Sequence, residues 1–176
     1  MTLTLMHRKT LAGFALVMFL YGTTLLGQEM KEMGKSPELD RMKTLAGSWK
    51  GVDPEGKPIN VSYKLVSEGT AVMEALGPVS HAESMVTMYH LDHGKLMLTH
   101  YCSMGNQPRL QLDRGKSSDS TFVFTFLDAT NMKSLDEAHI HGLTIIFRDK
   151  RHFAQEWVSR ENGKERSETF TYERVE

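Results

Sequence analysis

Apolar and polar side chains alternate strictly in Ile59-Asn60-Val61-Ser62-Tyr63-Lys64-Leu65. A period of two is the repeat of a β-strand that buries one face and exposes the other. Turn-forming residues stand on both sides, as Asp-Pro-Glu-Gly at residues 53–56 and Ser-Glu-Gly at residues 67–69. The stretch therefore predicts a short strand bounded by turns.

The same pattern recurs along the rest of the chain, and no helical pattern of about ten residues separates the strands. We expect about ten antiparallel strands, near residues 48–52, 59–66, 71–76, 85–91, 95–102, 110–113, 121–127, 139–147, 153–160 and 168–175. Many short strands with regular turns form a sandwich or a closed barrel. The sequence shows no repeat and no internal domain boundary.

One short helix is predicted before the first strand. Ser36 and Pro37 provide an N-cap and a first-turn proline, apolar residues follow at Leu39 and Met42, and Gly47 gives a stop. A helix this short is not stable alone and must pack on the strands.

Composition excludes several classes of protein. The chain has 176 residues, with 21 Lys and Arg, 22 Asp and Glu, and a single cysteine. Its length suits one domain with a real core. A net charge of -1 gives no electrostatic footprint for nucleic acid. One cysteine excludes a disulfide framework within the chain and a four-cysteine zinc module.

The N-terminal segment has the order of a secretory signal peptide. Residues 1–27 carry two basic residues and no acid, then an apolar run from Leu11 to Leu26 that ends at Gly27. That run is shorter than the roughly 20 residues of a membrane span. We expect cleavage after Gly27, a flexible leader over residues 28–35 and one domain over residues 36–176. The mature protein is expected to be periplasmic or secreted, with no stable membrane span.

The hairpin at residues 91–95, Leu-Asp-His-Gly-Lys, sets which histidines face inward. A three-residue loop with Gly94 in the left-handed conformation pairs Leu91 with Lys95. That register gives one inward face: Val86, Met88, His90, Leu96, Leu98 and His100. A loop of two or four residues instead pairs His100 with Thr87 and places it on a face with Tyr89 and Cys102.

A helix that runs into Gly47-Ser48-Trp49 resembles the opening of the calycin barrels, which include lipocalins, fatty-acid-binding proteins and nitrobindin-like haem barrels. In lipocalins a basic residue of the last strand stacks on that tryptophan and closes the barrel base. Arg174 occupies the matching place here. The resemblance implies an all-β, calycin-like barrel with one short N-terminal helix.

The run from Met85 to Arg109, with His139-x-His141 and Trp157, resembles a family of exported bacterial proteins of unknown function that is usually regarded as lipocalin-like. This similarity covers nearly all of residues 38–175. It implies a single lipocalin-like β-barrel over residues 36–176, with an interior cavity. The family brings no established activity, so no catalytic residue is carried over.

The densest polar cluster of the chain lies between residues 99 and 109. Its side chains can ring the barrel mouth and recognise a polar or anionic head group, with Arg109 able to give bidentate contacts. Equally, the segment can be a hydrogen-bonded turn that joins two strands. The candidate ligand contacts are His90, His100, Tyr101, Asn106, Gln107, Arg109 and Trp157.

Two histidines of one strand suggest a metal site. His139 and His141 lie on one face of the predicted strand, roughly 6.5–7 Å apart along it, so both can reach one ion. His100 is the candidate third ligand, with His90 as an alternative. The His-x-His pattern lacks the long-range spacing of a zinc signature, and such histidines often make only structural hydrogen bonds. Haem held by one axial histidine is the related possibility.

The sequence therefore predicts an exported binding protein for a small, mainly apolar or amphiphilic ligand held in the barrel cavity. The alternative is a metal- or haem-binding barrel that uses His100, His139 and His141, with or without enzymatic activity. A third is a structural module of the cell envelope. A P-loop, a Gly-x-Gly loop and a serine nucleophile elbow are all absent, which favours a binding role over catalysis without deciding between them.

Overall fold

The computed structural model describes residues 36–81 and 84–175. The predicted signal peptide and leader, residues 1–27 and 28–35, lie outside the described residues. None of the described helices is long and apolar enough to cross a membrane.

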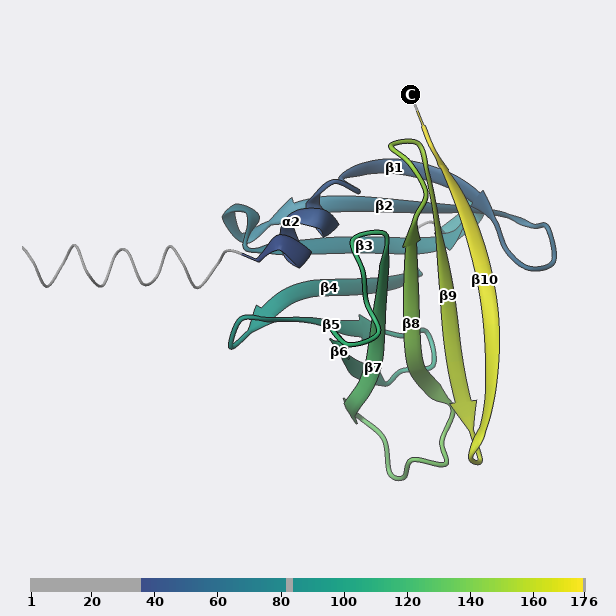
Figure 1. The fold of residues 1–176 in the computed structure, drawn as a ribbon. Coiled ribbons are helices and arrows are strands. Elements are labelled where there is room, and N and C mark those ends of the chain that lie inside the picture. The colour runs from purple at the N-terminus through teal and green to yellow at the C-terminus, as the bar shows by residue number, and fades with distance from the viewer. Residues whose placement is uncertain (1–35, 82–83, 176) are drawn as a thin grey trace, which may run out of the picture. The chain divides into compact units, whose positions relative to one another are not determined.

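Within the described residues the chain forms one α-helix, α2 (Pro37–Lys43), two short 3-10 helices and ten strands (Figure 1). The strands are β1 (Gly47–Val52), β2 (Pro58–Val66), β3 (Ala71–Pro78), β4 (Met85–Asp92), β5 (Lys95–Tyr101), β6 (Gln107–Leu112), β7 (Thr121–Thr130), β8 (His139–Phe147), β9 (His152–Glu161) and β10 (Lys164–Arg174). Each pairs antiparallel with its neighbours in sequence, and β1 pairs with β10, so the barrel is closed. The predicted ten-stranded antiparallel barrel with one short helix is confirmed.

Helix α2 forms for the predicted reasons. The Ser36 side chain accepts a hydrogen bond from the Leu39 backbone N–H, and Pro37 occupies the first turn. Leu39 and Met42 are fully buried, because α2 contacts β2, β3 and β4 and covers one end of the barrel. Gly47 does not end the helix: α2 ends at Lys43, and Gly47 is the first residue of β1.

The β4–β5 hairpin has a two-residue loop, so the predicted pairing of Leu91 with Lys95 is wrong. Asp92 pairs with Lys95 instead, and Thr87 pairs with His100, which is the alternative register. His93 and Gly94 both have positive φ, 47° and 74°, and such a turn matches the twist of the flanking strands. The inward face of the pair therefore consists of Thr87, Tyr89, Leu96, Leu98 and His100, all buried, whereas Met88 and His90 lie on the other face.

Trp49 and Arg174 close the barrel as the resemblance implied. They are opposite each other in the β1–β10 register, and the Arg174 guanidinium lies 4.1 Å from the Trp49 ring centroid. Arg174 also donates to the backbone carbonyls of Thr44 and Ala46, each at 2.8 Å. The Trp49 indole N–H donates to the Leu45 carbonyl at 2.8 Å. One side chain thus ties the last strand to the segment that joins α2 to β1.

Aromatic rings fill the middle of the barrel. Five of them make a continuous series of contacts, from Trp49 to Phe153, Tyr63, Tyr89 and Phe124. Successive ring centroids are 4.7, 5.8, 6.5 and 5.9 Å apart. All five side chains are at most 2% exposed, so this core holds opposite walls of the barrel together.

Replacing Arg174 by lysine is expected to destabilise the fold. The variant keeps a positive charge but loses the planar group that stacks on Trp49 and donates to several carbonyls, which should lower the free energy of unfolding by roughly 2 kcal/mol. Urea unfolding measures this. Arg166→Lys on the same strand, where the side chain is exposed, is the matched control and should change little. Equal losses in both variants would show that the stacked geometry does not matter.

Candidate functional site

A buried carboxyl group stands among the aromatic side chains of the barrel. Glu74 is 0% exposed, and its Oε2 accepts hydrogen bonds from Tyr89 Oη at 2.7 Å and Gln155 Nε2 at 2.9 Å. Gln155 Nε2 also lies 3.0 Å from Tyr63 Oη, and its Oε1 accepts from Trp157 Nε1 at 3.4 Å. Burial raises the pKa of Glu74, against the hydrogen bonds from these neighbours. The interior favours the neutral acid.

Two polar atoms of this interior have no hydrogen-bond partner among the described residues. They are Glu74 Oε1 and the Tyr172 hydroxyl, and both are fully buried. Burial raises the pKa of Tyr172 well above its ordinary value, and an ionised Glu74 would raise it further. Sequence reasoning missed Glu74, because its place in Met73-Glu74-Ala75 shows no sign that it points inward.

His100, a predicted ligand contact, is a core residue. It is 2% exposed, its ring lies 4.9 Å from the Trp157 ring, and its Nδ1 lies 2.9 Å from Thr87 Oγ1. Burial lowers the pKa of His100 to about 4. Predicted contact Trp157 is likewise buried, and His90 is half-buried on the other face of β4.

His139 and His141 belong to a chain of hydrogen bonds whose directions are fixed by its two ends. The Glu137 carbonyl can only accept, so His139 Nδ1, 2.7 Å away, carries a proton. Arg160 Nη1 can only donate, so His141 Nε2, 3.2 Å away, accepts. His141 Nδ1 therefore donates to His139 Nε2 at 3.1 Å, and both rings are neutral. Burial first, then the Arg160 charge, lowers the pKa of His141.

This arrangement leaves no free lone pair on either ring. The structure brings His139 and His141 together but does not bring His100 to them, since His100 packs on Trp157 and Thr87. Within residues 36–81 and 84–175, no three His, Cys, Asp or Glu side chains are placed to hold a metal ion. In the described structure the two histidines make hydrogen bonds to each other, to the Glu137 carbonyl and to Arg160.

Residues 102–106 form the turn that joins β5 to β6, and the rest of the 100–109 segment belongs to these two strands. The turn lies opposite α2, because Gly94 and Arg114, at the other ends of the two strands, lie beside α2. Arg109 makes a two-pronged ion pair with Asp128 on the outer surface, and this pair lowers the pKa of Asp128. Gln107 bonds to Gly105 and Thr130, while Asn106 is buried and donates to the Ala138 carbonyl. Tyr101 is half exposed. The described contacts are those of a turn that joins strands.

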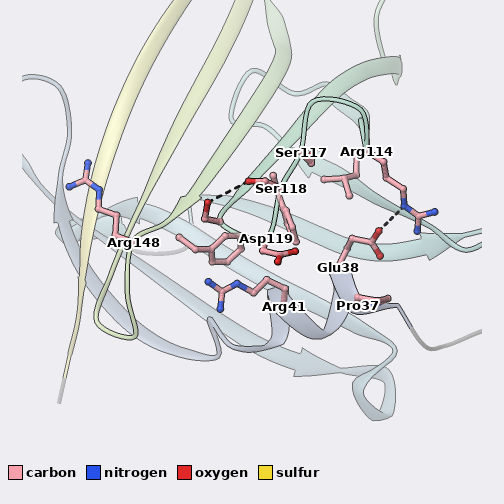
Figure 2. A pocket seen from close by; sticks show the side chains of 12 residues that line it. Pro37, Glu38, Arg41, Arg114, Ser117, Ser118, Asp119 and Arg148 are labelled. Atoms are coloured by element: carbon pink, nitrogen blue, oxygen red, sulfur yellow. Dashed lines mark hydrogen bonds and ion pairs between the residues drawn. The ribbon is translucent and has the colours of Figure 1, made fainter.

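A hollow of about 720 Å³ lies at the α2 end of the barrel. Its lining comes from three distant parts of the chain: α2, the 112–122 segment and the end of β8 (Figure 2). The apolar lining residues are Pro37, Leu112, Phe122 and Phe147, and none of the seven predicted ligand contacts lines it. Its signal in the sequence is the polar run of residues 117–120, Ser-Ser-Asp-Ser, which an ordinary turn also shows.

Charged groups in the hollow differ in whether they are paired. Glu38 Oε1 accepts from Arg114 Nε at 2.7 Å, and Arg114 also donates to the Gly94 carbonyl. Arg41 lies over the Phe147 ring, 4.3 Å from its centroid, and Asp119 stands on the facing turn. Neither Arg41 nor Asp119 has an ion-pair partner within the part of the chain that the structure describes.

Comparisons with known proteins assign no family. No protein-family model matches the chain, and no curated protein matches it. A solved structure with similarity to this chain is described as EF1p2_mFAP2b bound to DFHBI. It has a TM-score of 0.38 and 10% sequence identity, and the match covers 78% of this chain and 98% of that one. A similarity this low transfers no function to the present chain.

Stability should fall as the pH drops from 6.5 to 4, because of His100. The unfolded chain takes up the His100 proton near pH 6.5 and the folded chain only near pH 4, so acid favours unfolding by up to roughly 3 kcal/mol over this range. Urea unfolding across the range measures the slope. His100→Gln should flatten it, whereas His93→Gln, with a 95% exposed side chain, should leave it unchanged. An unaltered slope in His100→Gln would contradict the assignment.

The pH dependence that Glu74 gives to the stability should be opposite to that of His100. Burial raises the pKa of Glu74 in the folded state. The contribution of Glu74 to the free energy of unfolding is therefore complete below the ordinary carboxyl pKa of 4.5 and is lost as the pH rises through the folded-state pKa. Glu74→Gln imitates the neutral acid and should gain stability relative to the natural chain at pH 8 more than at pH 4. Glu74→Leu leaves the Tyr89 and Gln155 donors unpaired and should lose stability at both pH values. A pH-independent effect of Glu74→Gln would refute the raised pKa.

Proposed function

We propose that this protein is an exported binding protein for a small, mainly apolar ligand with an anionic group, held in the hollow beside α2. The observation that carries the proposal is the hollow itself, because its apolar floor and an unpaired arginine stand in one space of about 720 Å³. Small-molecule sites generally have such a volume and combine apolar side chains with polar groups. Four of the twelve lining residues of this hollow are apolar, and the others are polar or charged.

The apolar lining residues Leu112, Phe122 and Phe147, which form the floor of the hollow, are already packed together. Phe122 and Phe147 pack edge to face with ring centroids 5.1 Å apart, and both are buried among the core residues. Leu112 is 7% exposed and belongs to the same core. Little side-chain ordering is therefore needed when an apolar group settles on these three residues, which favours binding.

Arg41 is the group suited to an anion. Its guanidinium is stacked on Phe147 rather than neutralised by a carboxylate, and its Nε has no hydrogen-bond partner among the described residues. A carboxylate or similar oxyanion can take two hydrogen bonds from such a planar group. Arg114, by contrast, already forms an ion pair with Glu38.

This location differs from the interior cavity that the sequence suggested. In the barrel interior the aromatic rings contact one another, and Phe124, Tyr89 and Trp49 are almost completely buried. The end of the barrel offers the space instead. Export is proposed on the signal-peptide pattern of residues 1–27.

Blocking the hollow should abolish binding. We expect Ser118→Trp, at an exposed position that lines the hollow, to weaken binding of the apolar anion 1-anilinonaphthalene-8-sulfonate at least tenfold in a fluorescence titration. Ser167→Trp, at an exposed position of β10, is the matched control and should bind as the natural chain does. Equal binding by both variants would place the ligand elsewhere. Cell fractionation, with mass measurement of the mature N-terminus, tests export separately.

A further inference from the structure

We infer that the ligand of this hollow is a zwitterion with an apolar body, of the kind represented by an apolar amino acid. Arg41 receives its carboxylate, Asp119 receives its ammonium group, and the apolar body rests on Leu112, Phe122 and Phe147. The inference rests on the proposed function and specifies the chemistry of the ligand at the same site.

Arg41 and Asp119 carry opposite charges, line the same hollow and have no ion-pair partner among the described residues. Asp119 is exposed on the turn side and Arg41 is half-buried on the helix side, and both side chains face the hollow in Figure 2. Of the other ionised lining residues, Glu38 and Arg114 form an ion pair, whereas Arg148 has no ion-pair partner among the described residues and lies apart from Arg41 and Asp119 in Figure 2. A ligand that satisfies both Arg41 and Asp119 needs one anionic and one cationic group.

Arg41 and Asp119 form no ion pair with each other in the described structure. Arg41 is stacked on Phe147 at 4.3 Å, and Phe147 is fixed by its contact with Phe122. A cation held over an aromatic face gains electrostatic attraction from the ring, so Arg41 can remain in place without a carboxylate.

Asp119 is held in position by the turn that carries it. Ser117 Oγ donates to the Asp113 carbonyl at 2.7 Å and accepts from the Val123 backbone N–H at 3.0 Å. Backbone hydrogen bonds join Ser118 and Thr121 in both directions. The turn is thus fastened before and after Asp119, and the carboxylate faces α2 across the hollow. The ends of the site are set by two separate elements.

A simple anion fits this site less well than a zwitterion. When an anion binds Arg41, it also comes near the Asp119 carboxylate, and the repulsion between like charges reduces its affinity. An ammonium group on the same ligand converts that repulsion into attraction. Asp119 therefore selects against plain apolar anions, in the way that specific sites combine attraction with exclusion. The hydroxyls of Ser118 and Ser120, which also line the hollow, can accept from the same ammonium group.

Three ligands that differ by one charged group test the inference on the full chain. They are L-phenylalanine, 3-phenylpropionate, which lacks the ammonium group, and 2-phenylethylamine, which lacks the carboxylate. Ligand titrations followed by NMR should give the tightest binding for L-phenylalanine, by about two- to fivefold or more, the range of one exposed ion pair.

The Asp119→Asn variant separates the roles of the two charges. The variant should bind L-phenylalanine at least twofold more weakly and 3-phenylpropionate equally or more tightly. The preference for L-phenylalanine should then disappear. Asp136→Asn, which makes the same change at an exposed residue outside the hollow, should keep the preference.

The possible failures can be told apart. If 3-phenylpropionate binds the natural chain as well as L-phenylalanine does, or if Asp119→Asn keeps the preference, the zwitterion inference is wrong and the proposed binding site stands. If none of the three ligands binds and Ser118→Trp has no effect on 1-anilinonaphthalene-8-sulfonate, the proposed function is wrong as well.

Discussion

The contact between Arg174 and Trp49 is the interaction on which the rest of this structure depends. A ten-stranded sheet becomes a barrel only if its first and last strands meet, and these two residues stand opposite each other where they do. Arg174 also fixes the carbonyls of Thr44 and Ala46, through which α2 is attached to β1. Since α2 forms one wall of the hollow, the closure of the barrel and the geometry of the candidate site are set by the same side chain.

The two ends of the barrel have different chemistry. At the end opposite α2, several polar side chains bond to one another or to the backbone, as the bonds from His141 to His139 and from Asn106 to Ala138 show. Asn106 Oδ1 and Arg160 Nε have no hydrogen-bond partner among the described residues, but neither residue lines the hollow. At the α2 end, Arg41 is left with an aromatic partner and without a carboxylate. A binding site needs groups that the fold itself has not satisfied, and the structure supplies these beside α2.

The sequence predicted the fold well because its signals are local. Alternation identified all ten strands, and the Ser36-Pro37 cap identified the helix. The β4–β5 register was wrong because Gly94 fits loops of either two or three residues, and local sequence does not distinguish them. The candidate site was not predictable, since its walls come from residues near 41, 119 and 147, which only the folded barrel brings together. The polar residues near 100–109 lie at a hydrogen-bonded turn and the adjoining strand ends.

Pairing of the first strand with the last has a consequence for the order of events in the cell. Every other strand pair joins neighbours in the sequence and can form as soon as both strands exist, but the partners of β1 in β10 are residues 171–174, close to the end of the described chain. A loop of about 125 residues must then close, which is the slowest kind of contact to form. Until β1 and β10 pair, the sheet is open and its first strand has one unpaired edge. This late closure is compatible with the export that we propose on the pattern of residues 1–27.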